Sequence, residues 1–268
     1  MIRMLGPRGP RGPRGQVLVI AKEPVPGRVK TRLTPDFTPA QAAKLAEAAL
    51  TDTLLAAAAV PARRHVIALD GQPGDWLPGG FEVMPQHGDG LDQRIAAALS
   101  QAYADLPEPV VLIGMDTPQV TPDLIESALR PLTDDSADAS FGPADDGGFW
   151  LLGLRRPDPE LVRGVPMSTG DTGAAQLSRL VRAGLRVHWM RTLLDVDTAA
   201  DATAVASQVP GSRFAIALRA MTGRLPSPAP APAQAHDHAQ DHAQAQDHAE
   251  AGRARVQPTA AVPVAALP

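Results

Sequence analysis

The chain has 268 residues, with 25 Lys or Arg and 29 Asp or Glu, so its net charge is −4 at neutral pH. This slightly acidic balance argues against general nucleic-acid binding, which needs a basic surface. The chain contains no cysteine, which excludes disulfide bonds and thiol chemistry.

Residues 1–15 repeat Gly, Pro and Arg without any apolar period. Three Gly-Pro-Arg units are too few for a collagen helix, so we expect a disordered basic arm or a misassigned start. The stretch lacks the apolar core of a secretory signal. No later stretch approaches the roughly 18 apolar residues of a membrane span. We therefore expect a cytoplasmic protein without a membrane span.

Residues 16–225 alternate short apolar runs with longer amphipathic segments, which predicts one domain of strands and helices. Strands are predicted at 16–20, 64–69, 81–86, 109–116 and 185–190, with a strand, a loop and a second strand over 137–154. Helices are predicted at 38–59, 91–103, 121–130, 170–184, 197–208 and 212–221. Thr38 and Thr121 each precede a proline, which is typical of a helix start. The alternation predicts a three-layer α/β/α domain around a mostly parallel sheet.

The segment after the first predicted strand, residues 21–33, reads AKEPVPGRVKTRL. Its four cations are Lys22, Arg28, Lys30 and Arg32. Gly27 stands too far from Lys30 for a Walker P-loop, and the segment contains no GxGxxG. Several cations on a loop stiffened by prolines suit a diphosphate or triphosphate. The alternative is a solvated basic loop.

Two aspartates are candidates for a metal site. Asp116 follows the apolar run VVLIGM, and ligands of parallel sheets bind at the carboxyl ends of the strands. Asp195 and Asp197 form an Asp-x-Asp pattern before a predicted helix. If Asp197 lies near Asp116, the two could hold Mg²⁺ or Mn²⁺, which prefer oxygen ligands. Each aspartate could instead serve as a turn residue or helix cap.

A further loop has the sequence GPADDGGFW and contains Asp145, Asp146, Gly147 and Gly148. Asp-Gly-Gly is a good hairpin turn. Paired carboxylates beside glycines could also bind an acceptor hydroxyl, and Asp146 is our candidate for a general base. Phe149 or Trp150 could flank a sugar ring, although core packing is the commoner role of such residues.

Residues 226–268 are rich in Pro and Ala and then alternate His with Asp, so nothing there can bury a core. We expect a disordered tail. The alternative is a loose site for Zn²⁺ or Ni²⁺ formed by His236, His238, His242 and His248.

Four segments taken together resemble a known family. They are VIAKEPVPGRVKTRL (19–33), GMDTPQVTPDLI (114–125), GPADDGGFWLLGL (142–154) and LLDVDTAADA (193–202). Their order and spacing over residues 16–210 are similar to a bacterial GT-A-fold glycosyltransferase-like family with members in arsenosugar biosynthesis. KTRL and DVDT also resemble 2-phospholactate guanylyltransferases and molybdenum-cofactor nucleotidyltransferases. All of these share the nucleotide-diphosphosugar-transferase fold.

The resemblance implies roles for the matching residues. The four cations of residues 21–33 would face nucleotide phosphates, and Asp116 and Asp197 would hold Mg²⁺ or Mn²⁺. Residues 145–148 would line the acceptor or sugar pocket. The chain departs from the family at Thr117, where cysteine is usual, and at Met167, where tryptophan is frequent. Both departures concern the acceptor.

These observations favour a metal-dependent transferase, expected to be a glycosyltransferase that uses a nucleotide-activated sugar. Its partners would be a nucleotide sugar or nucleoside triphosphate and a small-molecule acceptor, with no nucleic acid. One alternative is a nucleotidyltransferase that releases pyrophosphate. A second is a non-catalytic nucleotide- or metal-binding protein.

Overall fold

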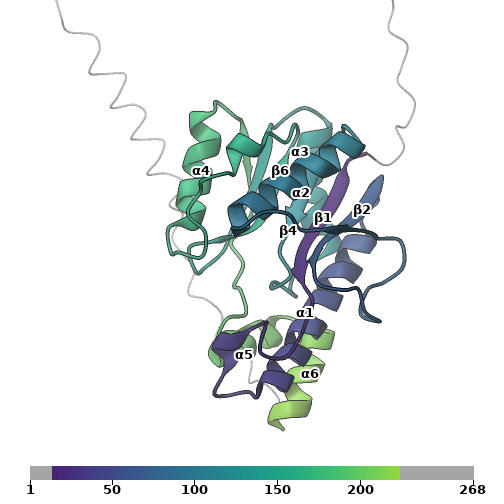
Figure 1. Ribbon diagram of the computed structural model, residues 1–268, viewed down its shortest axis with the longest axis vertical. Helices are drawn as coiled ribbons and strands as arrows, with labels where there is room; N and C mark the ends of the chain where they lie inside the picture. Colours follow the sequence, from purple (N-terminus) through teal and green to yellow (C-terminus); the bar gives the residue numbers. More distant parts are fainter. Residues whose placement is uncertain (1–13, 224–268) are drawn as a thin grey trace, which may run out of the picture. The chain divides into compact units, whose positions relative to one another are not determined.

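The computed structural model of the protein describes residues 14–223, which belong to one compact unit (Figure 1). The predicted arm lies outside the described residues apart from Arg14 and Gly15, and the predicted tail with its histidines lies wholly outside them. Within the described part, no helix is long and apolar enough to cross a membrane.

A seven-stranded sheet runs through the domain in the order β3-β2-β1-β4-β6-β5-β7. Its strands are β1 Gln16–Lys22, β2 Arg64–Asp70, β3 Glu82–Pro85, β4 Val110–Ile113, β5 Ala139–Pro143, β6 Phe149–Leu154 and β7 Val187–Trp189. Strand β6 is antiparallel to both β4 and β5, and every other pair of neighbours is parallel. The predicted mostly parallel sheet is confirmed.

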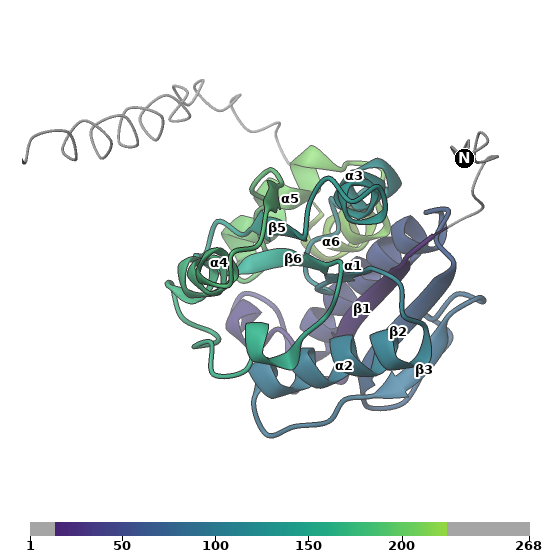
Figure 2. The ribbon, with the colours of Figure 1, turned by 90° about the horizontal axis from the view of Figure 1, so that it is seen from above.

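Helices cover both faces of the sheet. They are α1 Pro39–Ala58, α2 Leu91–Asp105, α3 Pro122–Thr133, α4 Thr172–Arg182, α5 Ala199–Gln208 and α6 Arg213–Thr222, with 3₁₀ turns η1 Thr31–Leu33 and η2 Pro159–Leu161. Successive residues of β1 point to opposite faces. Val17 and Val19 pack in the same core as α1 and α3, whereas Leu18 packs with α2. Figure 2 shows α2 and α3 on opposite sides of the sheet, so the three-layer α/β/α prediction is also confirmed.

A third core lies between the first half of α1, α5 and α6, and we call it the α5–α6 core (Figure 1). Its buried members are Leu33, Phe37, Ala42, Leu45, Ala49, Val196, Ala202, Val205, Ala206, Phe214, Ala215 and Leu218. The Asp52 carboxylate of α1 accepts hydrogen bonds from the backbone N–H groups of Arg213 and Phe214. These bonds complement the positive N-terminal end of α6 and fix it to α1.

The helix starts follow the sequence closely, whereas one strand end does not. Thr38 caps α1 in a full capping box with Gln41, and Thr121 caps α3. The predicted strand over 109–116 is wrong at its end, because β4 stops at Ile113. Asp116 therefore lies in a loop, where its carbonyl oxygen accepts a hydrogen bond from the Val196 N–H at 3.3 Å. This bond joins the loop to the segment that carries Asp195 and Asp197.

Candidate active site

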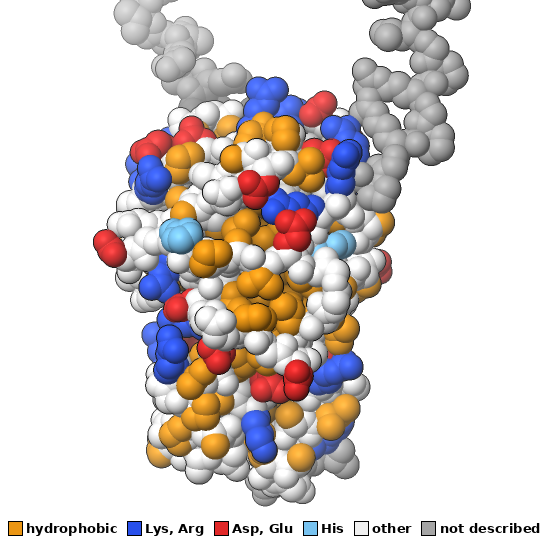
Figure 3. Space-filling view, turned by 45° about the vertical axis from the view of Figure 1, so that its right-hand side comes forward, with side chains coloured by type: hydrophobic (Ala, Val, Ile, Leu, Met, Phe, Trp, Pro, Cys, Tyr) orange, Lys and Arg blue, Asp and Glu red, His pale blue; other side chains and the backbone are white. Residues whose placement is uncertain are grey.

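An open cavity of about 570 Å³ lies beyond the carboxyl ends of β1 and β4, the edge where parallel sheets bind ligands. One part of its lining is apolar and comes from Ile20, Leu91, Ile95, Leu112, Phe149 and Met167. The charged part comes from Lys22, Arg28, Lys30, Arg32, Asp116, Asp146, Asp195 and Asp197. Figure 3 shows a face on which apolar side chains gather in a hollow with charged side chains around it. The fold thus brings all four predicted cations and both predicted metal ligands to one cavity.

Lys30 lies at the centre of the charged part. Its Nζ is 3.0 Å from Asp116 Oδ2 and 3.3 Å from Asp197 Oδ1, and its side chain is only 8% exposed. Burial alone would lower the pKa of the ammonium, but the two carboxylates outweigh burial and raise that pKa above its ordinary value. Arg32 Nη1 lies 2.7 Å from Asp197 Oδ2. Lys30 is therefore fully charged and holds two carboxylates together.

The local backbone directs Lys30 inward. Its φ of 49° lies in the left-handed region, which residues other than glycine seldom adopt. The following turn η1 begins at Thr31, and its last residue Leu33 is buried in the α5–α6 core. Residues in such sparsely populated conformations cluster at functional sites, where the surrounding structure holds them.

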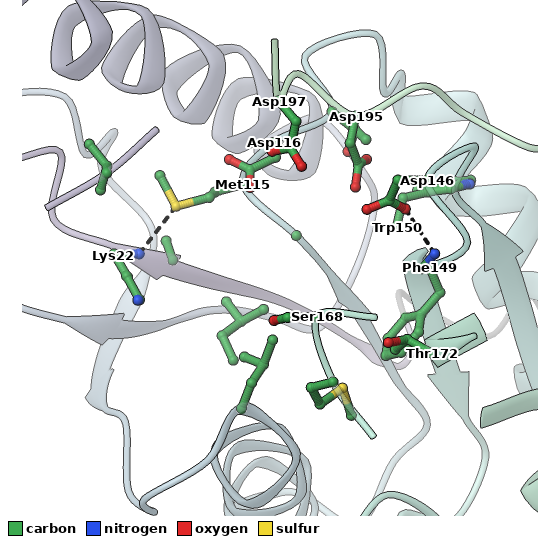
Figure 4. A pocket seen from close by; sticks show the side chains of 18 of the residues that line it. Lys22, Met115, Asp116, Asp146, Phe149, Trp150, Ser168, Thr172, Asp195 and Asp197 are labelled. Atoms are coloured by element: carbon green, nitrogen blue, oxygen red, sulfur yellow. Dashed lines mark hydrogen bonds between the residues drawn. The ribbon is translucent and has the colours of Figure 1, made fainter. Parts of the chain in front are cut away.

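Asp195 is a member of the site whose importance the sequence does not reveal. Figure 4 shows its carboxylate between those of Asp116 and Asp146. Its Oδ1 is buried and has no hydrogen-bond partner among the described residues. Burial, followed by the charges of Asp116 and Asp146, raises the pKa of Asp195 to about 7. The Asp-x-Asp pattern is the only signal in the sequence that points to this residue.

Asp195→Asn is expected to stabilise the ligand-free protein at pH 8, on the order of 3 kcal/mol, and to change little at pH 4. An unfolded aspartate ionises near pH 4, whereas the folded Asp195 keeps its proton until about pH 7. The folded state therefore binds more protons in this window, so wild-type stability falls as the pH rises through it. Chemical unfolding in EDTA from pH 4 to 8 measures the difference. A constant gap between the two proteins would contradict the expectation.

The loop between β5 and β6 separates its two aspartates. Asp146 borders the cavity, and its Oδ1 accepts a hydrogen bond from the Gly148 N–H at 2.8 Å, so the predicted turn also forms. Asp145 is exposed and is not among the residues that line the cavity. Trp150 is buried, and its Nε1 donates to the Arg191 carbonyl, which makes core packing its main role. Phe149 borders the cavity and is half-buried.

The glycines of this loop are needed for packing. Gly147 has a φ of 85°, and a Cβ built on it would lie 1.9 Å from the Gly170 carbonyl oxygen. The Gly147 carbonyl accepts a hydrogen bond from the Gly173 N–H at 2.7 Å. Gly148 lines the cavity, whereas Gly147 does not. The loop is thus packed backbone against backbone on the segment before α4.

That segment, residues 167–170, also lines the cavity. Met167 is the one residue of this segment that the family resemblance had linked to the acceptor. Ser168 has a φ of 60° and points into the cavity in Figure 4. The Thr117 hydroxyl, also in the cavity lining, is buried without a hydrogen-bond partner among the described residues. The Ser-Thr-Gly run before α4 is the signal that could have pointed to this wall.

The carboxylates fit a metal ion that would take its remaining ligands from a bound phosphate. Within residues 14–223, no group of three or more His, Asp or Glu side chains is arranged to hold a metal ion. Mg²⁺ is commonly bound by one or two carboxylates together with substrate phosphates, rather than by a complete protein cage. Asp116 and Asp197 present two carboxylates to one cation, Lys30, in a cavity with further cations suited to phosphate.

Known proteins are similar to this chain in sequence and in overall fold. Residues 41–169 match the family described as "Uncharacterized protein conserved in bacteria (DUF2064)". A "putative nucleotide-diphospho-sugar transferase" from Desulfovibrio desulfuricans G20 is 29% identical, with a TM-score of 0.71 over 79% of this chain and 96% of its own. None of the curated proteins matches the chain significantly.

Two further solved structures are more distant. A nucleotidyl transferase from Methanothermobacter is 16% identical over 71% of this chain and 94% of its own, with a TM-score of 0.48. The 2-C-methyl-D-erythritol 4-phosphate cytidylyltransferase of Thermus thermophilus is 17% identical over 75% of this chain and 98% of its own, with a TM-score of 0.44. Likeness this remote carries no argument about function. The family match and the likeness to the Desulfovibrio structure together support the predicted resemblance to the nucleotide-diphosphosugar-transferase superfamily.

Proposed function

We propose that this protein is a metal-dependent transferase that moves a sugar from a nucleotide-activated donor to a small-molecule acceptor. The observation that carries the proposal is the position of the Lys30 ammonium between Asp116 and Asp197, in a cavity with three further cations. Cations and carboxylates at one cavity end suit a nucleoside diphosphate and its divalent counter-ion. The name of the Desulfovibrio neighbour agrees with such a donor.

The exposed arginines suit the diphosphate. Arg32 is 69% exposed and Arg28 is 59% exposed, and the nearest carboxylate to Arg28, that of Asp70, lies 3.9 Å away. An exposed ion pair of this kind contributes little, so Arg28 can turn to a phosphate at small cost. Guanidinium groups bind phosphate oxygens through two parallel hydrogen bonds, which orients the donor.

Asp116 and Asp197 would hold the Mg²⁺ or Mn²⁺ ion. When bound, such an ion stabilises the negative charge that develops on the departing nucleoside diphosphate. Lys30 and Arg32 add positive charge at the same end of the cavity, where the departing diphosphate would lie.

Asp146 is proposed to accept the proton of the acceptor hydroxyl. The Gly148 N–H fixes one carboxylate oxygen, which leaves the other free for a hydroxyl in the cavity. A general base must lie within hydrogen-bond distance of the proton that it removes. The apolar wall from Ile95, Leu112 and Phe149 would exclude water around the acceptor.

Nucleoside diphosphates are expected to raise the melting temperature only when Mn²⁺ is present. A ligand that binds only the folded state at 100 times its Kd adds about 2.7 kcal/mol of stability. A thermal-shift panel of ADP, CDP, GDP and UDP, each with and without Mn²⁺, tests this expectation and identifies the preferred nucleobase. An equal shift without Mn²⁺ would contradict the metal dependence.

The product distinguishes the two transfer chemistries. With the preferred base known, the corresponding nucleotide sugars and nucleoside triphosphate are each incubated with Mn²⁺ and a panel of small alcohols. We expect release of nucleoside diphosphate from a nucleotide sugar. Pyrophosphate released from the triphosphate instead would show nucleotidyl transfer and would contradict the glycosyl proposal.

A further inference from the structure

We infer that Lys30 is an exchangeable counter-ion, which holds Asp116 and Asp197 together in the ligand-free protein and moves to the nucleotide phosphates when the metal ion binds. The inference rests on the proposed function, because it places metal and phosphate in this cavity.

The contacts of the two carboxylates set up the exchange. Lys30 Nζ engages Asp116 Oδ2 and Asp197 Oδ1, and Arg32 engages Asp197 Oδ2. Three of the four carboxylate oxygens are therefore in contact with protein cations already. A metal ion that used both carboxylates would compete with the ammonium for the same oxygens.

The ammonium cannot stay where it is once a divalent ion arrives. Like charges a few ångströms apart repel strongly at a partly buried site. Lys30 is 8% exposed, so bulk water screens this repulsion poorly. A nucleotide in the cavity offers phosphate oxygens as the new partners. After the exchange the carboxylates face the metal ion and the ammonium faces phosphate, so every charge is again paired.

Lysine suits this movement better than arginine. Its compact ammonium sits on a flexible four-carbon stem, whereas the planar guanidinium holds a carboxylate through a rigid fork. The chain contains only three lysines, Lys22, Lys30 and Lys44, and its other 22 basic residues are arginine. The position between the two carboxylates is one of the few at which this arginine-rich chain uses an ammonium.

The exchange predicts opposite effects of removing Lys30. Without the ammonium, Mn²⁺ meets no competitor, so Lys30→Met should bind Mn²⁺ alone about tenfold more tightly than wild type, or better. The same variant should bind a nucleoside diphosphate in the presence of Mn²⁺ about tenfold more weakly, because a phosphate partner is lost. A residue with only a structural role would weaken both.

Mn²⁺ alone is titrated into the full chain, with free Mn²⁺ followed by electron paramagnetic resonance. Lys44→Met is the matched control. It removes the same charge from an exposed position on α1, and Lys44 is not among the residues that line the cavity. We expect this control to stay within about threefold of wild type. If Lys30→Met binds Mn²⁺ no more tightly than wild type does, the inference is overturned.

A repeat of the titration with the nucleoside diphosphate preferred in the thermal-shift panel separates the two levels of the argument. If wild type binds Mn²⁺ with the diphosphate, and Lys30→Met shows no gain without it, the exchange is wrong and the proposed function stands. If wild type binds no Mn²⁺ under either condition, the proposed function fails and the exchange fails with it.

A measurement on wild type keeps the inference testable should Lys30→Met not fold. With three lysines, ¹⁵N spectra of the side-chain ammonium groups contain few signals, and Lys22→Met and Lys44→Met assign them. We expect the Lys30 signal to shift with Mg²⁺ and the diphosphate together, and to shift little with Mg²⁺ alone. A Lys30 signal unmoved by a diphosphate that binds would overturn the exchange.

Discussion

Asp116→Asn should weaken Mn²⁺-dependent binding of a nucleoside diphosphate about 100-fold or more, and transferase activity should fall with it. Loss of the outer partners of metal ligands already costs about 10- to 100-fold, and Asp116 is proposed as a direct ligand. The amide has nearly the shape of the carboxylate but lacks its charge, so the change tests charge rather than packing. Isothermal titration calorimetry with and without Mn²⁺ measures the loss.

The control is Asp123→Asn, which removes an equal charge from the exposed first turn of α3. Asp123 is not among the residues that line the cavity, so binding should remain near wild type. Asp116→Asn that binds the diphosphate with Mn²⁺ as tightly as Asp123→Asn would refute the assignment of Asp116 to the metal ion.

Gly147→Ala should destabilise the protein by about 3 kcal/mol or more, which is among the larger effects expected of a single substitution. The new Cβ would lie 1.9 Å from the Gly170 carbonyl oxygen, and the φ of 85° disfavours any side chain. Backbone on both sides prevents easy relaxation, so the loop or the segment before α4 must move. Urea unfolding measures the change in the free energy of unfolding.

Comparison with Gly184→Ala separates the steric part of this destabilisation from the part that comes from backbone strain. Gly184 has a φ of 72°, close to that of Gly147, but a Cβ there would meet no atom within 4 Å. Its substitution should cost about 1 kcal/mol from backbone strain alone. Equal losses in the two variants would mean that the contact between Gly147 and Gly170 relaxes freely.

Much of the fold could be predicted because its signals are local. Thr-Pro helix starts and short apolar runs depend on neighbouring residues, and they located α1, α3 and most strands correctly. The rule that parallel strands end at one edge of the sheet also made Asp116 and Asp197 candidates for a shared site on the sequence alone. The end of β4 was misplaced because Gly114 and Met115 continue an apolar run although the ladder stops at Ile113.

The remaining features of the site depend on contacts between distant segments. Asp145 and Asp146 are chemically identical neighbours, and only the turn made by the Gly148 N–H directs one of them to the cavity. The raised pKa of Asp195 comes from burial and from charges on two other loops. No local pattern encodes the distance between Gly147 and Gly170.

The α5–α6 core links the charged side chains of the cavity to α6, a helix that does not line the cavity. Leu33 follows Arg32, and Val196 separates Asp195 from Asp197, and both apolar side chains are buried in this core. The segment with the cation Arg32 and the segment with Asp195 and Asp197 are thus both held by the α5–α6 core, which is separate from the cores on the two faces of the sheet. The last described helix, α6, supplies part of that core without lining the cavity. A substitution that weakens the packing of α6 would therefore displace the charged side chains of the cavity first, while the sheet stays folded.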